Sequence, residues 1–173
     1  VGLHALEGWS ICPDGTISSP QSPLRVMHIR VSSRSREVPQ WDQPIIDCRV
    51  TATADLCGTH VDGALRFGFG ICREPGLARR AELGPTAVTC PGPDQADEHA
   101  HGRVVMRCRQ SDEGGRFFRD VTTYRIVDLD RAGPDPGKVW LSLSEIRALL
   151  DRGGYFTNEA RSLISVLMRY LVG

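Results

Sequence analysis

The order in which strand-like and helix-like patterns follow one another constrains this fold more than any other feature of the sequence. Strand patterns extend from residue 24 to residue 129, and both segments with helical periodicity lie after residue 141. Alternating strands and helices would predict a parallel sheet, whereas strands followed by helices predict the α+β class. We therefore expect a mixed or antiparallel sheet with helices at the C-terminal end of the chain.

Six segments carry the short apolar or alternating patterns that are typical of strands. In 65–72, LRFGFGIC, large and small residues alternate, which predicts a strand with a neighbour close to its glycines. Pro44 limits 41–46 to an edge strand or to a turn into a strand. The expected strands are 24–32, 41–46, 65–72, 85–90, 103–109 and 122–129.

Two helices are expected after the strands. Ser142 or Ser144 can cap a first helix that ends near Asp151, and Thr157 or Asn158 can cap a second that ends near residue 170. Apolar residues recur at helical spacing in the second helix, which indicates a core face or a dimer seam. They are Leu163, Ile164, Leu167, Met168 and Leu171.

Length and charge restrict the domain organisation and the classes of partner. A chain of 173 residues suggests a loosely ordered arm over 1–22, where Gly, Pro and Ser gather, and a single domain over 23–173. The 21 basic and 21 acidic side chains cancel, which argues against binding to nucleic acid or to an anionic membrane. We find no signal-peptide pattern and no apolar run near the ~18 residues of a membrane span. A cytoplasmic protein is therefore expected.

The cysteine and histidine patterns favour neither disulfides nor a metal site. Six cysteines stand at irregular spacings without a CxxC pair, and we expect them to be reduced and mostly buried. His99 and His101 lie in 91–102, a stretch rich in Pro, Gly, Asp and Glu that predicts a flexible loop. No Cys or His pair has the spacing of a structural zinc site, so no metal is expected.

The segment 111–116, SDEGGR, concentrates reactive groups between two expected strands. A carboxylate can act as a base, and a guanidinium can bind a phosphate through two parallel hydrogen bonds. The paired glycines allow a positive φ or the close approach of a ligand to the backbone. The same composition fits a hairpin loop with solvated charges, so both interpretations stand.

Four segments, in this order, resemble the NDP-hexose 2,3-dehydratase family of deoxysugar biosynthesis. Together they cover the chain from about residue 24 to residue 171. They are REV and WDQPII at 36–38 and 41–46, EPG and ELGPT at 74–76 and 82–86, SDEGGRF at 111–117, and NEARSL at 158–163.

The resemblance implies a Nudix-like α+β fold without the Nudix metal box, in a single copy of a repeat that the family carries twice. It implies a lyase that acts on a dTDP-linked 4-keto-6-deoxyhexose, removing the C3 proton beside the ketone and then the C2 hydroxyl as water. Such a reaction demands no metal or redox cofactor. The resemblance further implies a small-molecule substrate, a role in antibiotic or other natural-product biosynthesis, and a homodimer that restores the two-repeat architecture.

The resemblance also supplies candidates for catalysis. Glu74 and Glu113 are the candidate base and acid, in either order, and Tyr124 is the candidate donor to the enolate oxygen. Each has a structural alternative. Glu74 can cap a turn, Glu113 can be part of an ion pair, and Tyr124 can pack against the core of a strand.

Four further residues are candidates for substrate binding. Arg116 and Arg161 can hold the diphosphate, while Gln43 can orient a polar group of the ligand beside Trp41. Here too a structural role is the alternative. Arg161 can pair with a carboxylate at 112 or 113 in a buried ion pair, and Trp41 can belong to the core.

Two segments depart from the family's pattern. Residues 87–92 read AVTCPG where the family carries a glutamine and a polar Asn-Tyr segment, and 121–124 read VTTY, which keeps only the tyrosine. These changes leave two alternatives open. One is a lyase, cyclase or isomerase that acts on a non-sugar natural-product intermediate, and the other is a non-catalytic binding subunit.

Overall fold

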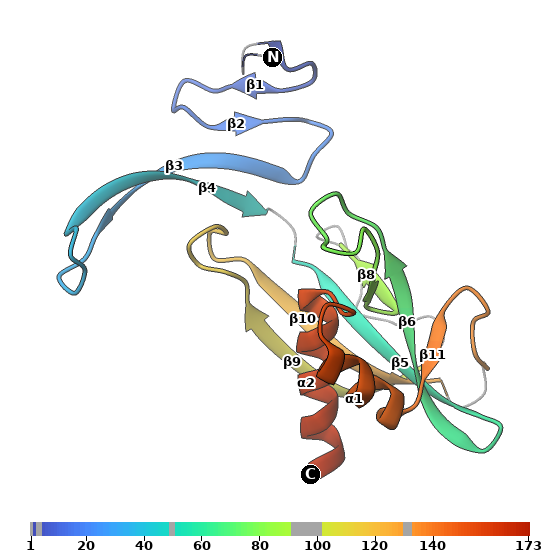
Figure 1. Ribbon diagram of the computed structural model, residues 1–173. Helices are drawn as coiled ribbons and strands as arrows, with labels where there is room; N and C mark the ends of the chain where they lie inside the picture. The colour runs from blue at the N-terminus through green and yellow to red at the C-terminus, as the bar shows by residue number, and fades with distance from the viewer. Residues whose placement is uncertain (1, 3–4, 49–50, 91–101, 130–132) are drawn as a thin grey trace. The chain divides into compact units, whose positions relative to one another are not determined.

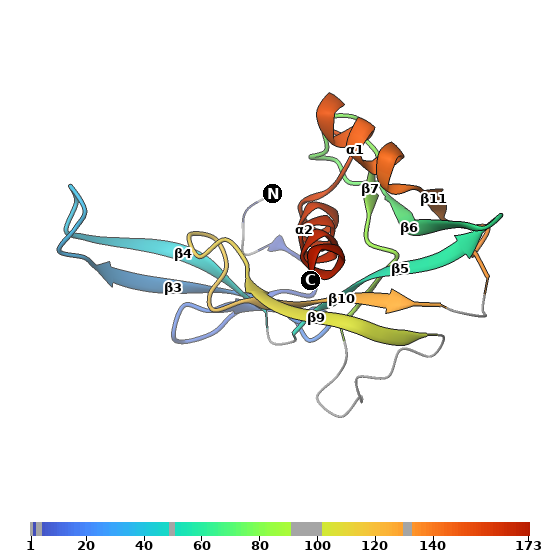
Figure 2. The same cartoon turned by 90° about the horizontal axis from the view of Figure 1, so that it is seen from below.

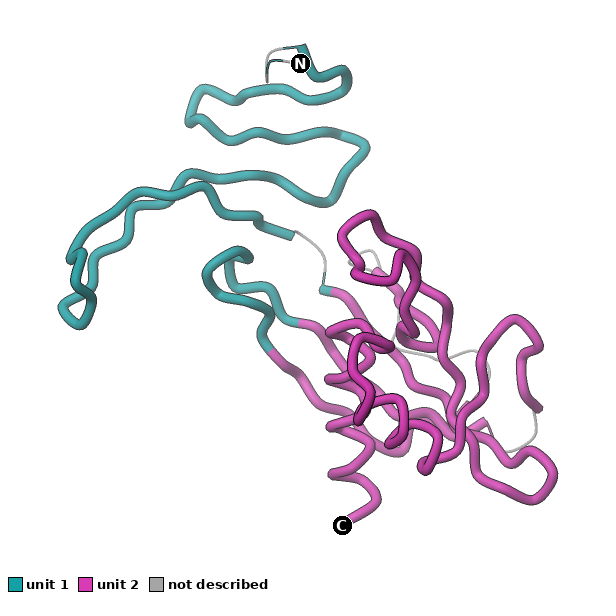
Figure 3. The backbone as a smooth tube through the Cα atoms, viewed as in Figure 1, with its two compact units in different colours: residues 1–51, 111–121 teal, residues 52–110, 122–173 magenta. Residues whose placement is uncertain are grey.

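The computed structural model describes residues 2, 5–48, 51–90, 102–129 and 133–173 (Figure 1). It divides into two compact units, one formed by 1–51 with 111–121 and the other by 52–110 with 122–173 (Figure 3). The sequence predicted one domain over 23–173 and not this division into two units. The expected α+β class is confirmed, because two helices follow the mixed sheets at the C-terminal end.

The first unit contains a four-stranded antiparallel sheet in chain order. Its strands are β1 (Ser10–Ile11), β2 (Ile17–Ser18), β3 (Leu24–Ser32) and β4 (Gln40–Cys48). β3 and β4 form a hairpin paired over all nine residues of each strand. The two short strands β1 and β2 extend this sheet within the segment expected to be a loose arm.

Pro44 lies inside β4, opposite His28 of β3. β4 is the last strand in the order of its sheet, so the proline occupies an edge strand, as expected from its missing amide hydrogen.

Two arginine–aspartate pairs also cross the hairpin. Arg25 Nε lies 2.5 Å from Asp47 Oδ2, and Arg30 Nε lies 3.0 Å from Asp42 Oδ1.

The second unit contains a larger mixed sheet. Along its main path the strand order is β11-β6-β5-β10-β9, while β7 pairs with β6 and β8 pairs with β5. β10 runs parallel to β5, and the other pairings of β5 and β6 are antiparallel. The strands are β5 (Thr53–Val61), β6 (Ala64–Cys72), β7 (Glu82–Gly84), β8 (Ala87–Thr89), β9 (Arg103–Ser111), β10 (Val121–Asp128) and β11 (Val139–Leu141).

The two helices begin at the serine and threonine that the sequence offers as caps. For α1 (Leu143–Arg152), the Ser142 hydroxyl accepts from the amide of Glu145, whose carboxylate in turn accepts from the Ser142 amide. For α2 (Asn158–Val172), the Thr157 hydroxyl accepts from the amide of Ala160. Gly153, with φ of 69°, ends α1.

Both helices lie on the same side of the large sheet, where they cover its main core (Figure 2). Alternate residues of β5, β6 and β10 face the helices, and Phe69 meets Phe156 with ring centroids 5.2 Å apart. In α2 the predicted apolar stripe is buried at Leu163, Ile164 and Leu167, whereas Met168 and Leu171 are exposed. The core members are Ala54, Leu56, Phe67, Phe69, Tyr124, Ile126, Ile146, Phe156, Ala160, Leu163, Ile164, Val166 and Leu167.

The predicted close neighbours of β6 are found at two glycines. A Cβ on Gly68 would lie 2.8 Å from the Trp140 ring, and a Cβ on Gly70 would lie 2.9 Å from the carbonyl oxygen of Pro85. β11 and the residue that follows β7 therefore pack against β6 at positions where no other residue fits without a shift.

Membrane-spanning helices and metal sites can be assessed only over the described part of the chain. Over the described residues, no helix is long and apolar enough to cross a membrane, and no group of three or more His, Cys, Asp or Glu is placed to hold a metal. His99 and His101, with 91–101 as a whole, lie outside the described residues. All six cysteines are within them and are free thiols, but only Cys57 is buried, so the expectation that most of them are buried is wrong.

Candidate functional site

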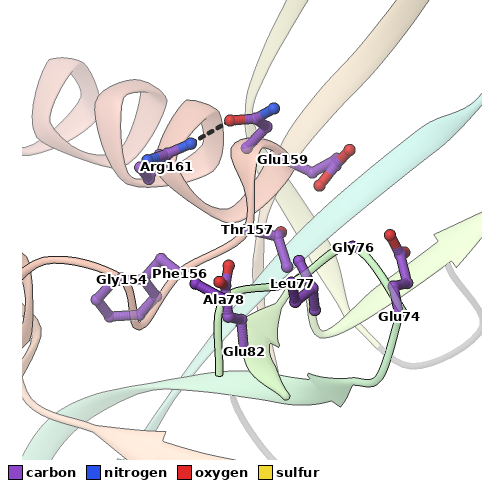
Figure 4. Close-up of a pocket in the computed structure, with 11 residues that line it drawn as sticks. Glu74, Gly76, Leu77, Ala78, Glu82, Gly154, Phe156, Thr157, Glu159 and Arg161 are labelled. Carbon is purple, nitrogen blue, oxygen red and sulfur yellow. Dashed lines mark hydrogen bonds between the residues drawn. The ribbon is translucent and has the colours of Figure 1, made fainter. Parts of the chain in front are cut away.

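A pocket of about 290 Å³ lies in the second unit, between the turn after β6, the strand β7 and the start of α2 (Figure 4). Two of the four segments that carry the family resemblance, the EPG–ELGPT pair and NEARSL, supply most of its wall. The lining residues are Glu74, Gly76, Leu77, Ala78, Glu82, Gly154, Phe156, Thr157, Asn158, Glu159 and Arg161.

Backbone hydrogen bonds fix the start of α2 beside β7. The amide of Leu83 donates to the carbonyl oxygen of Tyr155 at 2.7 Å, and the amide of Thr157 donates to the carbonyl oxygen of Leu83 at 3.0 Å. The Arg79 guanidinium stacks over the Tyr155 ring, 4.4 Å from its centroid. The segment before α2 thus joins the sheet edge, and this places the first turn of α2 over the turn that carries Glu74.

Three carboxylates line this pocket: Glu74, Glu82 and Glu159. Cys72 Sγ donates to Glu74 Oε1 at 3.2 Å, and Cys72 is also the partner of Glu82 in the β6–β7 register. Burial raises the pKa of the Cys72 thiol, and so do its hydrogen bond to Glu74 and the negative charges of Glu74, Glu159 and Glu82. The thiol therefore keeps its proton and acts as a hydrogen-bond donor at neutral pH.

Arg161 is the cation of the pocket lining, and it lies in the first turn of α2. Its guanidinium donates to Asn158 Oδ1, as the dashed line in Figure 4 marks. Sequence reasoning also considered an ion pair with a carboxylate at 112 or 113. The structure gives this arginine a neutral partner from its own helix.

A second group of predicted residues comes together in the first unit. Trp41 Nε1 donates to Gln43 Oε1 at 2.7 Å, and Gln43 Nε2 donates to the carbonyl oxygen of Gly115 at 2.8 Å. Arg116 Nη2 lies 3.7 Å from Glu113 Oε2, and both side chains are largely exposed. The WDQPII and SDEGGRF segments, about seventy residues apart, are therefore neighbours.

The structure thus distributes the seven predicted site residues over three places. Glu74 and Arg161 line the pocket of the second unit. Tyr124 is buried in the core beneath the helices, with 5% of its surface exposed, and its role as a donor to an enolate stays a prediction. The other four, Trp41, Gln43, Glu113 and Arg116, share the first unit.

One local expectation is corrected at the paired glycines. Neither Gly114 nor Gly115 adopts a positive φ, so the backbone conformation does not require glycine at either position. A Cβ on either would meet no described atom within 4 Å. The other proposed reason for the pair, the approach of a ligand to the backbone, stays a prediction.

Sequence reasoning missed two carboxylates of the pocket, Glu82 and Glu159. Glu82 is the first residue of ELGPT, and Glu159 is the second residue of NEARSL; both segments carry the family resemblance. That position was the available signal.

Comparison with known proteins identifies a family. The family model described as NDP-hexose 2,3-dehydratase matches residues 1–167. The chain is 26% identical over 159 residues to the dTDP-4-dehydro-6-deoxy-alpha-D-glucopyranose 2,3-dehydratase of Amycolatopsis orientalis, which covers 83% of this chain and 34% of that protein. It is 28% identical over 159 residues to the protein of the same name from Saccharopolyspora spinosa, with 82% and 32% covered. The chain thus spans about a third of the length of these curated relatives.

A solved structure supports the fold. The crystal structure of an ADP compounds hydrolase aligns with a TM-score of 0.63 over 98% of this chain and 97% of that chain, at 15% sequence identity. At this identity the likeness concerns the fold alone. The expected Nudix-like α+β architecture is confirmed.

Proposed function

Because the chain belongs to the NDP-hexose 2,3-dehydratase family, we propose that it takes part in the 2,3-dehydration of a nucleotide-linked 4-keto-6-deoxyhexose. The names of the curated relatives support this choice of substrate. The observation that carries the proposal is the pocket of the second unit, where three carboxylates and one guanidinium surround about 290 Å³.

The chemistry of this elimination calls for acid–base groups. The C4 ketone acidifies the C3 proton, and a base that removes this proton leaves an enolate. The enolate electrons then form the C2–C3 double bond as the C2 hydroxyl takes up a proton and departs as water. Substrate and products differ by one water molecule and no net change of oxidation state, so the balance requires no redox partner.

We assign the base to Glu74. Its Oε1 accepts the Cys72 thiol hydrogen at 3.2 Å, and this bond favours one orientation of the carboxylate. The thiol remains protonated because burial and the surrounding carboxylates raise its pKa. A proton acceptor thus stands at the edge of the pocket with its geometry set by a neighbour.

We assign the acid to Glu82. This side chain is half-buried, whereas Glu74 and Glu159 are exposed, and it makes no side-chain hydrogen bond or ion pair with another described residue. A carboxyl group that is shielded and not engaged elsewhere is suited to deliver a proton to a leaving hydroxyl. Arg161, at the same pocket, can contact an anionic part of the ligand.

The test separates proton abstraction from elimination. The protein is incubated with dTDP-4-keto-6-deoxyglucose in D₂O, and proton NMR follows deuterium uptake at C3 and, through the change in the signal of the carbon-bound C2 proton, the elimination of the C2 hydroxyl. We expect Glu74→Gln to abolish both, and Glu82→Gln to keep the C3 exchange while slowing elimination at least a hundredfold. Glu7→Gln, which removes an exposed carboxylate far along the chain, is the control. Absence of C3 exchange with the unaltered protein would refute the proposal.

For the first unit we propose that Arg116 contacts an anionic group of a ligand. Two-thirds of its side chain is exposed, and its ion-pair partner Glu113 lies 3.7 Å away. A guanidinium held this weakly keeps donors available for phosphate oxygens. Calorimetric titration with dTDP tests this, since Arg116→Met should remove binding that Arg34→Met, an exposed arginine of the β3–β4 turn, retains.

We also propose that two copies of this chain associate. Support comes from the last turn of α2, which exposes Met168, Leu171 and Val172 by 50%, 39% and 83%. Light scattering on the purified chain should give the mass of a dimer, and Met168→Glu with Leu171→Glu should give that of a monomer. A monomeric unaltered chain at working concentration would overturn this point.

A further inference from the structure

A chain of side-chain hydrogen bonds joins β4 to the loop 111–121 within the first unit. Trp41 Nε1 donates to Gln43 Oε1 at 2.7 Å, and Gln43 Nε2 donates to the Gly115 carbonyl oxygen at 2.8 Å. An indole nitrogen can only donate and a carbonyl oxygen can only accept, so these partners fix which way the Gln43 amide points. Glutamine is the residue whose length and paired donor and acceptor satisfy both neighbours at once.

Backbone contacts hold the same loop on either side of Gly115. The amide of Ile46 donates to the Arg116 carbonyl oxygen at 2.9 Å, and the amide of Phe118 donates to the Ile46 carbonyl oxygen at 2.7 Å. Within the loop, the amides of Arg116 and Phe117 both donate to the Glu113 carbonyl oxygen at 2.9 Å. The backbone around Arg116 is thus fixed against β4, although the side chains of Glu113 and Arg116 are 60% and 67% exposed.

The fold itself does not explain why this loop carries two glycines. Neither has a positive φ, and a Cβ on Gly114 or Gly115 would meet no described atom within 4 Å. Their missing side chains leave the backbone amides beside Arg116 open to a ligand. An ordered, bare backbone next to an exposed guanidinium is an arrangement suited to an anion.

We infer that Gln43 is a positioning residue for this loop. It fixes Gly115, and through Gly115 it fixes the bare backbone from which the Arg116 side chain extends toward the anionic group of a ligand. The inference rests on the ligand role proposed above for Arg116. Trp41 and Gly115 engage one lone pair of the Gln43 oxygen and one hydrogen of its nitrogen, and the expected role of Gln43 in orienting a polar group of the substrate stays a prediction.

The substitution Gln43→Glu isolates the donor half of this link. An ionised carboxylate still accepts from Trp41, but it cannot donate to the Gly115 carbonyl oxygen unless it is protonated. Gln40→Glu is the matched control, because it adds the same charge to an exposed position of the same strand, where no side-chain hydrogen bond to a described residue is lost.

Amide exchange measured by NMR at pH 7.5 and pH 4.5 reads out the link. In Gln43→Glu at pH 7.5 we expect the Ile46 and Phe118 amides to exchange roughly three- to tenfold faster than in the unaltered protein, the loss expected for one hydrogen bond. The Trp41 indole signal should keep its hydrogen-bonded position. At pH 4.5, close to the ordinary pKa of a glutamate, part of the introduced carboxyl is protonated, so the difference should become smaller than at pH 7.5. Unchanged exchange at pH 7.5, or the same effect in Gln40→Glu, would overturn the inference.

Titration with dTDP then tests the consequence for ligand binding, using Gln43→Met to avoid added charge. We expect this variant to bind dTDP about tenfold more weakly than the unaltered protein. Binding by Gln43→Met that equals the unaltered protein, while Arg116→Met has lost binding, overturns the positioning role alone. If Arg116→Met binds dTDP as well as the unaltered protein, or if the unaltered protein does not bind dTDP, the ligand role of Arg116 is overturned and the positioning role of Gln43 with it. The amide exchange result would still establish the hydrogen-bonded link between Gln43 and Gly115.

Discussion

Arg125 of β10 donates two parallel hydrogen bonds to Asp55 of β5, from Nε to Oδ1 at 2.7 Å and from Nη2 to Oδ2 at 2.9 Å. The two residues are register partners in the parallel pair at the centre of the large sheet. Only 1% of Asp55 and 4% of Arg125 is exposed. Because alternate residues of these strands face the helices, this ion pair lies on the opposite face, beside Cys57 and Val127.

Removing one partner of this ion pair should strongly destabilise the protein. Arg125→Met leaves a buried carboxylate without its counter-charge, and we expect the free energy of unfolding to fall by about 3–5 kcal/mol in urea titrations followed by circular dichroism. The double variant Asp55→Leu with Arg125→Met should recover most of this loss. The exposed pair offers a comparison, since Arg30→Met should cost no more than about 0.5 kcal/mol. Equal effects at the two arginines would contradict the role given to burial.

A methyl group on Gly70 should also destabilise the sheet. The added Cβ would lie 2.9 Å from the Pro85 carbonyl oxygen, a backbone atom that cannot rotate away. We expect Gly70→Ala to lower the free energy of unfolding by about 1–3 kcal/mol. Gly76→Ala meets no described atom within 4 Å and should stay within about 0.5 kcal/mol of the unaltered protein. The same urea titration compares the two.

Alanine at both Gly114 and Gly115 should leave the fold intact and weaken ligand binding. Because neither glycine has a positive φ or a close neighbour among the described atoms, the double variant is expected to be as stable as the unaltered protein or up to about 1 kcal/mol more stable. If the bare backbone serves ligand approach, calorimetry should show weaker dTDP binding. Full binding by this variant would return the loop to a purely structural role.

Stability should fall at alkaline pH because of Cys57. Burial raises the pKa of this thiol to about 11, mainly by disfavouring the thiolate. Between the ordinary pKa of a free thiol and 11, the unfolded chain is ionised at this site while the folded chain retains the proton. The free energy of unfolding therefore decreases as pH rises through that window, by at most about 1.4 kcal/mol per pH unit.

Unfolding titrations at pH 8 to 11 on the unaltered protein and on Cys57→Ala check this expectation. The variant lacks the titrating thiol, so its stability should depend less steeply on pH above about 9 than that of the unaltered protein. Parallel pH curves for the two proteins would show that another group causes the loss.

The reactivity of Cys72 reports on the state of Glu74. Burial and the neighbouring carboxylates raise the pKa of this thiol, so little thiolate is present at pH 8 and alkylation by iodoacetamide should be slow. Glu74→Gln removes both a negative charge and the charged acceptor, which lowers the thiol pKa and should speed alkylation several-fold. Mass spectrometry of the Cys72 peptide gives the rate, with the exposed Cys90 as an internal reference.

The parts of the fold that sequence predicted best are those whose pattern is local. The helix caps at Ser142 and Thr157 and the alternation in β6 each depend on neighbouring residues, and the structure confirms them. The central strand β5 was missed. Its sequence TADLCGTHV is buried at seven consecutive positions, so it shows no alternation, and Asp55 within it finds its counter-charge only on a strand seventy residues later.

Only part of the candidate site was predicted, because contacts between distant segments of the chain bring its residues together. Glu74 and Arg161 belong to segments far apart in sequence, and both line one pocket. Glu82 and Glu159 were overlooked because only the packing of α2 against β7 brings them to that pocket. The alternation of β10 turns Tyr124 toward the core beneath the helices, as its structural alternative expected, and its role as a donor to an enolate stays a prediction.

The pairing of β5 with β10 also governs the order in which this protein can fold. β5 joins β6 by a short hairpin, but its parallel partner stands seventy residues further along the chain, as the separation of Asp55 and Arg125 shows. Closing so long a loop carries an entropic cost before any contact offsets it, and pairings of this kind slow folding. During synthesis, one edge of β5 therefore stays unmatched until β10 leaves the ribosome, and the buried carboxylate of Asp55 is neutralised only at that late step.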